Sequence, residues 1–159
     1  MKKGSVFIFL ILVCCAIGSS AVAQKKKQRR KSETEAVINT AKSYIGTPYK
    51  WGGNSKAGMD CSGLIHLSYK AAGYNIPRTA KEQSKYGKNR GWNGIQPGDV
   101  VFFKFKEKRS KWWHSGMITE VNGDQIKFIH ASSSRGVTIS NLMSDYYRKS
   151  VKGFRRWIK

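Results

Sequence analysis

Acidic residues and cysteines are both scarce in this sequence, and no segment of it is repeated. Only 9 of the 159 residues are Asp or Glu, whereas 30 are Lys or Arg; the formal charge of +21 suggests an anionic partner. The lack of a repeat period of about 20 to 50 residues excludes a solenoid or propeller. The length allows one domain and a tail, and the 40% hydrophobic and 12% aromatic content excludes a wholly disordered protein.

The amino terminus has the pattern of a secretory signal peptide. Lys2 and Lys3 precede an unbroken apolar run over residues 6–17, and residues 21–23 read Ala-Val-Ala, a small-x-small cleavage site. A membrane-spanning helix needs about 20 apolar residues, and Gly18 ends this run too early. We therefore expect cleavage and export rather than a membrane anchor.

Lipid attachment to Cys14 or Cys15 is an alternative to this cleavage. The residues before these two cysteines are Val13 and Cys14, whereas a lipoprotein signal usually has Gly, Ala or Ser there, so the sequence favours cleavage. Removal of the leader would leave Cys61 as the single cysteine of the mature chain. An internal disulfide is then excluded, and the remaining thiol is either reactive, paired with another molecule or buried.

The expected organisation is a signal peptide (residues 1–23), a basic flexible tail (24–32) and one folded domain (33–159). An exported protein would reside in the periplasm, in the cell envelope or outside the cell. Its positive surface would then meet anionic envelope polymers rather than nucleic acid. The densest basic run, at residues 25–31, is either a tethering arm for such a polymer or merely a solvated tail. The sequence leaves the oligomeric state open.

Three helices are expected in the first half of the domain. A capping box, Ser-Glu-Thr-Glu at residues 32–35, predicts the start of the first helix, and Gly46 ends it. Small and apolar residues from Cys61 onward support a second helix, which Gly73 ends. Another capping box, at residues 79–82, opens a short third helix.

Strands are expected in the second half of the domain. Five segments are rich in β-prone residues: 100–105, 114–121, 125–131, 137–139 and 154–158. The second and third of them flank Asn122-Gly123-Asp124, a sequence typical of a tight hairpin turn. Helices that precede strands in this way predict an α+β domain with its helices packed on an antiparallel sheet.

Cys61 is a candidate nucleophile. It follows a glycine-containing loop and stands where the second helix should begin, so unpaired backbone N–H groups and the helix dipole would surround its sulfur. That environment favours the thiolate, which is the nucleophilic form, and the same N–H groups can bind an oxyanion. The alternative interpretation is a small, buried and inert cysteine.

A cysteine nucleophile needs a base, and the chain has three histidines. His66 lies about 140° around the helix from Cys61, so it cannot readily reach the sulfur and is expected to pack or to face solvent. His114 and His130 stand on either side of the predicted hairpin turn, at positions that make them near cross-strand neighbours. One imidazole could therefore orient the other, as a nucleophile, base and orienter set requires.

Zinc binding by Cys61, His114 and His130, with Asp60 as a fourth ligand, is an alternative use of the same side chains. No C-x-x-C, H-x-x-x-H or H-E-x-x-H spacing is present, and a single thiolate offers little to a structural zinc site. We therefore expect neither a metal nor an organic cofactor.

Five short segments form a combined motif when they are taken in order. They are P-Y-K-W-G-G at 48–53, G-M-D-C-S-G-L at 58–64, Q-P-G-D-V-V-F-F at 96–103, H-S-G-M-I at 114–118 and F-I-H-A-S at 128–132. Together they resemble the NlpC/P60 family of bacterial cell-wall cysteine peptidases, over roughly residues 34–157. The resemblance implies a circularly permuted, papain-like α+β fold. It also implies hydrolysis of amide bonds in peptidoglycan stem peptides, typically between γ-linked D-glutamate and the following diamino acid.

The resemblance further implies roles for individual residues. Cys61 matches the nucleophile, His114 the base and His130 the third polar residue, which orients the base. Tyr49 matches a tyrosine near the nucleophile that could assist the oxyanion, although it could also be a packing aromatic.

Two residues beside the nucleophile, Asp60 and Ser62, match positions that contact the amino side of the stem peptide. Alternatively, Asp60 caps the helix and Ser62 fills its first turn. The basic segment from Lys104 to Trp113 is either a rim over the cleft or a long basic hairpin. The sequence leaves open which bond is cut, which diamino acid is preferred and whether the wall must be trimmed beforehand.

Two other functions remain open at this point. An amidase or acyltransferase would use the same cysteine and histidine pair on another acyl substrate, and a transferase would need a second acceptor. A non-catalytic module would bind anionic envelope polymers without any turnover. The products formed from purified peptidoglycan distinguish these functions.

Overall fold

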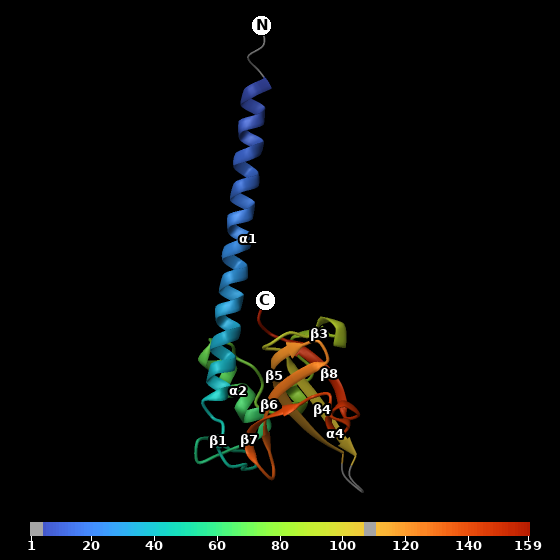
Figure 1. Ribbon diagram of the computed structural model, residues 1–159. Helices are drawn as coiled ribbons and strands as arrows, with labels where there is room; N and C mark the ends of the chain where they lie inside the picture. The colour runs from blue at the N-terminus through green and yellow to red at the C-terminus, as the bar shows by residue number, and fades with distance from the viewer. Residues whose placement is uncertain (1–4, 107–110) are drawn as a thin grey trace. The chain divides into compact units, whose positions relative to one another are not determined.

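The computed structural model describes residues 5–106 and 111–159, with side chains described at residues 21–105 and 113–159. The chain divides into two units, one up to Glu33 and one over Thr34–Lys159 (Figure 1). Every residue of the candidate site described below belongs to the second unit.

Helix α1 (Ser5–Lys42) begins in the first unit, and its last turns, from Thr34 onward, belong to the second. Ser32 therefore lies inside a helix, and the helix start predicted from the capping box is wrong. Within the part of the chain that the structure describes, no helix combines the length and the apolar character needed to cross a membrane.

Residues 24–32, expected as a flexible tail, lie in α1 with exposed side chains. Lys, Arg and Gln, which make up most of this segment, have high helix propensity. Arg29 also pairs with Glu33 one turn later, at 3.4 Å. The helix therefore continues through the position where a capping box would otherwise start one.

The other helices of the second unit are short: α2 (Cys61–Ala71), α3 (Ala80–Gln83) and α4 (Asp145–Arg148), with a 3₁₀ turn η1 (Trp92–Gly94). α2 and α3 begin where the sequence predicts. Thr79 caps α3 by accepting a hydrogen bond from the Glu82 backbone N–H at 3.3 Å. α4 was not predicted, because one turn of helix has too little hydrophobic periodicity to detect.

Six strands form one antiparallel sheet in the order β3-β8-β4-β5-β6-β7. Their bounds are β3 (Lys88–Arg90), β4 (Val100–Lys106), β5 (Lys111–Asn122), β6 (Gln125–Ser132), β7 (Gly136–Asn141) and β8 (Val151–Arg156). A separate ladder of β1 (Asn54–Ser55) and β2 (Gly58–Met59) precedes α2, which packs on β5 and β6 (Figure 1). The predicted α+β class, with helices against an antiparallel sheet, is confirmed.

The β5–β6 hairpin turns where the sequence predicts. Asn122 pairs with Gln125, and Gly123 has φ +55°, the positive value that such a tight turn requires. Met117 pairs with Ile129, and His130 follows Ile129 directly; extended by one residue, this register sets His130 opposite Gly116 and diagonal to His114. Diagonal neighbours on one face are within reach of long or aromatic side chains.

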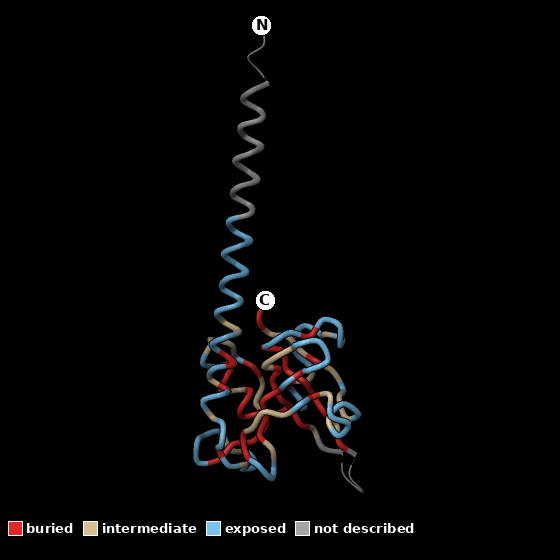
Figure 2. The backbone as a smooth tube through the Cα atoms, in the orientation of Figure 1, coloured by how far each residue is buried: buried red, intermediate tan, exposed pale blue. Residues whose placement is uncertain are grey.

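Two hydrophobic clusters form the core, and alternate residues of β4 contribute to each. Val100 and Phe102 join the cluster that contains α2, whereas Val101, Phe103 and Phe105 join the other. This alternation follows from the two-residue period of a strand. Figure 2 shows the buried residues gathered in the sheet and in the helix that packs on it.

The loop after α1 forms backbone hydrogen bonds with β7. These bonds fix the position of the loop just before Tyr49. The Gly46 N–H donates to the Val137 carbonyl at 2.9 Å, and the Val137 N–H donates to the Thr47 carbonyl at 2.8 Å. Gly136, at φ +69°, allows this approach, because a Cβ there would collide with the Thr47 backbone.

Asp99 and Arg156 form a buried ion pair between the start of β4 and the end of β8. Arg156 Nε and Nη2 each donate to one Asp99 oxygen at 2.6 Å, and the Gln96 N–H donates to Oδ2 at 2.8 Å. Only 1% of the Asp99 side chain and 18% of the Arg156 side chain are exposed. The guanidinium therefore compensates a carboxylate that has little contact with water.

Replacing Arg156 by methionine is expected to destabilise the fold strongly. Removing one partner of a buried pair leaves an uncompensated charge, which typically costs about 3–5 kcal/mol, and for a domain of this size that lowers Tm by roughly 10–20 °C. Arg155→Met is the matched control, since Arg155 donates to the Asn89 side chain and the Phe154 carbonyl rather than to a carboxylate. Equal Tm values for the two variants in calorimetry would contradict this account of Asp99.

Candidate active site

Cys61 is the first residue of α2, and Asp60 caps that helix. Asp60 has an extended backbone (φ −95°, ψ 170°), and its carboxylate accepts a hydrogen bond from the Gly63 N–H at 2.6 Å. Asp60 thus occupies the capping position that the sequence offered as an alternative to substrate contact. Cys61 carries a free thiol, is 7% exposed and lines a cleft.

Three hydrogen-bond donors approach the sulfur of Cys61: the backbone N–H groups of Ser62 and Ser115 and the hydroxyl of Ser115. Burial nevertheless raises the pKa of the Cys61 thiol above its ordinary value, by more than these donors lower it. The resting sulfur is therefore protonated. This corrects the expectation of a resting thiolate, which took account of the helix dipole but not of the loss of water around the sulfur.

The hydroxyl of Ser115 is a second buried polar group at this sulfur. Ser115 follows His114 on β5 and has no exposed surface. Among the described residues, no group forms a full hydrogen bond with its Oγ. A hydroxyl held this way is free to turn its hydrogen toward Cys61 when negative charge develops on the sulfur.

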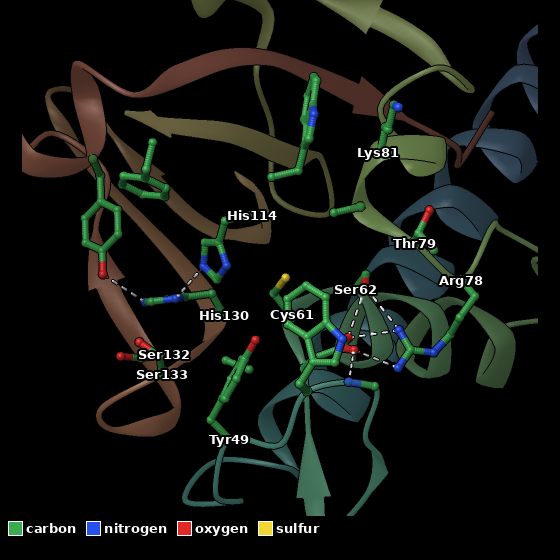
Figure 3. A pocket seen from close by; sticks show the side chains of 18 of the residues that line it. Tyr49, Cys61, Ser62, Arg78, Thr79, Lys81, His114, His130, Ser132 and Ser133 are labelled. Atoms are coloured by element: carbon green, nitrogen blue, oxygen red, sulfur yellow. Dashed lines mark hydrogen bonds and ion pairs between the residues drawn. The ribbon is translucent and has the colours of Figure 1, made fainter. Parts of the chain in front are cut away.

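His114 on β5 and His130 on β6 are neighbours, as the hairpin geometry predicts. His114 Nε2 and His130 Nδ1 are 2.9 Å apart, and the two rings are nearly perpendicular, at 88°. Figure 3 shows the other ring nitrogen of His114 turned toward the sulfur of Cys61, with His130 on the far side of His114. The fold thus brings together three predicted residues from α2, β5 and β6.

The other ring nitrogen of His130, Nε2, also has polar neighbours. Its Nε2 lies 3.0 Å from the Ser140 hydroxyl and 3.3 Å from the Tyr147 hydroxyl. Arg135 donates to the same Ser140 oxygen at 3.3 Å. If Ser140 accepts the His130 Nε2–H, then His130 Nδ1 accepts the His114 Nε2–H, and His114 Nδ1 is left as the basic nitrogen facing Cys61.

Both imidazoles are neutral at pH 7. Burial, with a smaller contribution from the neighbouring His130, lowers the pKa of His114 to about 3. Burial likewise lowers the pKa of His130 to about 4, with a smaller contribution from the Arg135 charge. A neutral imidazole beside a protonated thiol is the arrangement from which a proton can move from sulfur to nitrogen.

The buried neutral histidines are expected to make the fold sensitive to acid. An unfolded histidine titrates near pH 6.5, whereas the folded values are about 3 and about 4, so the unfolded chain binds more protons between about pH 4 and 6.5. The free energy of unfolding is therefore highest above pH 6.5 and falls as the pH drops through this window.

The variant His130→Gln tests this acid sensitivity, because glutamine can hydrogen-bond but does not titrate. Its free energy of unfolding should fall less steeply below pH 6.5 than that of the wild type, by up to about 1.4 kcal/mol per pH unit. Urea unfolding at several pH values between 4.5 and 7.5 measures the two slopes. Parallel slopes would show that His130 is not the group that takes up the proton.

The carboxylate of Asp60 accepts hydrogen bonds at both oxygens. Oδ1 accepts from Gly63 N–H (2.6 Å), Ser62 Oγ (3.0 Å) and Arg78 Nη1 (2.9 Å), and Oδ2 accepts from Gly52 N–H (2.9 Å) and Arg78 Nη2 (2.9 Å). Arg78 Nη1 also donates to the Ser62 hydroxyl at 3.1 Å, and Figure 3 shows Arg78 turned toward Ser62. Burial alone would raise the pKa of Asp60, but the Arg78 guanidinium and the other donors hold it below the ordinary value.

Tyr49 stands at the opposite side of the cleft entrance from Arg78. It bridges to Met59 at the end of β2, and in Figure 3 its hydroxyl points toward the space between Cys61 and His130. Burial raises the pKa of Tyr49, as do the nearby Cys61 and Asp60, so its hydroxyl keeps its proton and can donate a hydrogen bond.

The cleft at Cys61 has a volume of about 860 Å³. Aromatic side chains line much of it: Tyr49, Trp51, Phe105, Trp113, Tyr146 and Tyr147. At the two ends of the basic segment 104–113, residues 104–106 of β4 pair with residues 111–113 of β5, and Lys104 lies 5.5 Å from the Trp113 ring centre. The other basic side chains of this segment, at residues 106–111, lie outside the described side chains, so the choice between a rim over the cleft and a basic hairpin stays a prediction.

His66 does not belong to the site. Its Nδ1 lies 2.8 Å from the Ile76 carbonyl, which agrees with the prediction that it cannot reach Cys61. Among the described residues, no group of three or more His, Cys, Asp or Glu side chains is arranged to hold a metal ion. Asp60 was the fourth ligand in the zinc alternative, but both of its carboxylate oxygens accept hydrogen bonds from Arg78.

Sequence reasoning missed Arg78, Ser115, Ser140 and Tyr147. Arg78 follows Pro77 in a loop and meets Asp60 from 18 positions away, so no local pattern indicates the pair. Ser115 could have been found, because it is adjacent to His114 in the quoted H-S-G-M-I segment. Ser140 and Tyr147 come from β7 and α4, whose packing on the histidines no short motif reports.

Comparison with known proteins gives a consistent result. The model of the NlpC/P60 family matches residues 46–156. Gamma-D-glutamyl-L-lysine dipeptidyl-peptidase of Bacillus subtilis (strain 168) is 35% identical over 79% of this chain and 42% of its own length. The bifunctional muramidase/DL-endopeptidase CwlT of the same organism is 37% identical over 77% of this chain and 36% of its own length.

A solved structure agrees with these relatives. An NlpC/P60 family protein from Bacillus cereus ATCC 10987 superposes with a TM-score of 0.70 at 33% identity, over 79% of this chain and 40% of that one. The chain spans less than half the length of these three proteins. Because the family model covers more than half of the sequence and the fold agrees, this protein belongs to the NlpC/P60 family.

Proposed function

We propose that this protein is an exported cysteine endopeptidase that hydrolyses amide bonds in peptidoglycan stem peptides, of the γ-D-glutamyl–diamino acid type. The observation that carries the proposal is the hydrogen-bonded pair of His114 and His130 beside the thiol of Cys61 at a helix start. The activities for which two relatives are named, γ-D-glutamyl-L-lysine dipeptidyl-peptidase and DL-endopeptidase, support the substrate class.

The reaction begins with a neutral thiol and a neutral imidazole. His114 Nδ1 takes the proton of Cys61 as the sulfur attacks the amide carbonyl, which gives a tetrahedral oxyanion. We assign the stabilisation of that oxyanion to the backbone N–H of Cys61, which is unpaired at the start of a helix, and to the Tyr49 hydroxyl; the direction of that hydroxyl in Figure 3 supports the assignment. The C–N bond then breaks, and the His114 proton passes to the leaving amine.

A thioester between Cys61 and the acyl part of the substrate remains after the amine leaves. Water then attacks the thioester while His114 again accepts a proton, and the sulfur leaves with that proton returned to it. His130 contributes by fixing the tautomer and angle of the His114 ring, and Ser140 fixes His130 in turn. These steps need only groups of this chain and one water molecule.

Asp60 and Ser62 act on the amino side of the substrate within this proposal. Asp60 holds the start of α2 and the guanidinium of Arg78 in place, and Ser62 joins the same network. This network would then contact the part of the stem peptide that carries its amino end.

The place of action proposed here is the cell envelope. Residues 1–23 would serve as a signal peptide removed on export, ahead of the tail at 24–32 and the domain from residue 33. The exposed basic run at residues 25–31 would then contact anionic envelope polymers.

Digestion of purified peptidoglycan tests the proposal. Mass spectrometry of the soluble fragments should find each cut accompanied by one added water and a new free amine on the diamino acid. If an added amine is incorporated instead, the protein is an acyltransferase. If the wall binds the protein and no fragment is released, the protein is a binding module, and the endopeptidase proposal fails.

A further inference from the structure

The side chain of Ser115 points to the face of the sheet that carries α2. Ser115 pairs directly with Phe102 of β4, and paired residues of neighbouring strands project to the same face. Phe102 packs in the hydrophobic cluster that contains α2, and α2 itself packs on β5. Because α2 begins with Cys61, the hydroxyl of Ser115 and the sulfur of Cys61 meet where the helix meets the sheet.

The backbone of Ser115 also reaches this sulfur. Within the described residues, the β5–β6 ladder ends with the pair of Met117 and Ile129, so Ser115 lies two residues outside it. Its N–H is therefore not taken by β6, and it donates to the sulfur of Cys61. One residue thus supplies two donors to the sulfur: a main-chain N–H that the strand holds in place and a hydroxyl that can rotate.

The hydroxyl of Ser115 has no competing use. Ser115 has no exposed surface, and apart from the sulfur no polar group among the described residues pairs with its Oγ. A buried hydroxyl without a full hydrogen bond lowers the stability of a fold, because it has lost its contact with water. A negatively charged sulfur would supply the missing acceptor, and hydrogen bonds to charged groups are stronger than those between neutral groups.

The other groups around the sulfur do not take over this role. Burial disfavours a thiolate at Cys61, and the negative charge of Asp60, the N-cap of α2, disfavours it further. The Tyr49 hydroxyl keeps its proton, and His114 is neutral until it accepts the thiol proton. Hydrogen-bond donors are therefore the first groups to stabilise negative charge on the sulfur, and the hydroxyl of Ser115 can turn to follow that charge.

We propose that Ser115 is a catalytic residue: its hydroxyl donates a hydrogen bond to the sulfur of Cys61 whenever that sulfur carries negative charge. In the proposed peptidase reaction, on which this part of the inference rests, that happens twice. It happens when His114 takes the thiol proton, and again when the thioester breaks and the sulfur leaves. Ser115 keeps its own proton in both steps, and no bond to it forms or breaks, so it stabilises charge without transferring a group.

Alkylation of Cys61 by iodoacetamide tests the hydrogen bond without any peptide substrate. The rate on the full chain is followed by mass spectrometry of the peptide that contains Cys61, at several pH values between 7 and 9. Ser115→Ala should lower this rate about three- to tenfold, because a thiol that has lost the donor ionises less readily. An unchanged or faster rate would overturn the inference, whether or not the peptidase function stands.

Ser68→Ala is the matched control for this experiment. Ser68 likewise has no exposed surface, but its hydroxyl lies on α2 and donates to the Leu64 carbonyl at 2.7 Å. The alkylation rate of this variant should equal that of the wild type. Its Tm should fall further than that of Ser115→Ala, which loses no full hydrogen bond. The same loss of alkylation in both variants would refute a specific role of Ser115.

Steady-state kinetics on a stem peptide separates this role from substrate binding. Ser115 is not among the described residues that line the cleft, so Ser115→Ala should lower kcat about tenfold and leave KM within about twofold of the wild type. A loss that appears in KM alone would overturn the assignment of Ser115 to the sulfur. If the wild type cuts no stem peptide, the proposed function fails, and the alkylation rates still decide the role of Ser115.

Discussion

Replacing Cys61 by alanine is expected to reduce the hydrolysis of peptidoglycan stem peptides by at least about 10⁴-fold, to background. The reason is chemical: alanine has no atom that can form the acyl-enzyme, and no second cysteine is described within reach of His114. The substitution removes one buried sulfur at the first residue of α2 and leaves the N-cap residue Asp60 unchanged. The fold should therefore persist, and steady-state kinetics on a soluble stem peptide measures the loss.

A matched control is available in the same cleft. Ser133 lines the cleft and is exposed, so Ser133→Ala should leave kcat/KM within about threefold of the wild type. Circular dichroism and Tm of both variants show whether the fold is intact. A folded Cys61→Ala variant that still released the wild-type set of fragments would contradict the cysteine mechanism.

The second large effect is expected at His114. His114→Ala removes the group that takes the thiol proton and returns it to the leaving amine, so kcat should fall about 10²–10⁴-fold. We expect the fall in kcat to lie near the upper end of this range. Because the pKa of Cys61 is raised, little of its thiol ionises unless a base removes the proton.

His130 is expected to matter less than His114, because it touches the base and not the substrate. His130→Ala should lower kcat about 10- to 100-fold, as is typical when the partner that orients a working imidazole is removed. His130→Gln should recover part of that loss, since an amide can still hydrogen-bond His114. If His130→Ala were as inactive as His114→Ala and glutamine gave no recovery, the assignment of base and orienter would be wrong.

Much of this architecture could be predicted from local pattern. α2 and α3 follow from apolar spacing and caps, and the β5–β6 hairpin follows from Asn122-Gly123. That hairpin also indicated the meeting of His114 and His130, because a tight turn fixes which residues of two strands are neighbours. Prediction succeeds here because each of these features depends on residues close together in the chain.

Other features depend on contacts that no local pattern contains. Asp60 and Arg78, 18 positions apart, are separated by α2 and the loop after it, and His130 and Tyr147, 17 positions apart, are separated by β7 and the loops around it. The protonation of Cys61 was mispredicted for a related reason, because burial of the sulfur depends on how α2 meets the sheet. The start of α1 was mispredicted because strong helix formers precede the capping box.

Trapping the covalent intermediate tests the central step most directly. A stem-peptide substrate is mixed with the protein, the reaction is stopped with acid within milliseconds to seconds, and the intact mass is measured. The mechanism predicts an added mass equal to the acyl part of the substrate, lost on treatment with hydroxylamine and located on the peptide that contains Cys61. Turnover without any such adduct, or an adduct on another residue, would contradict it.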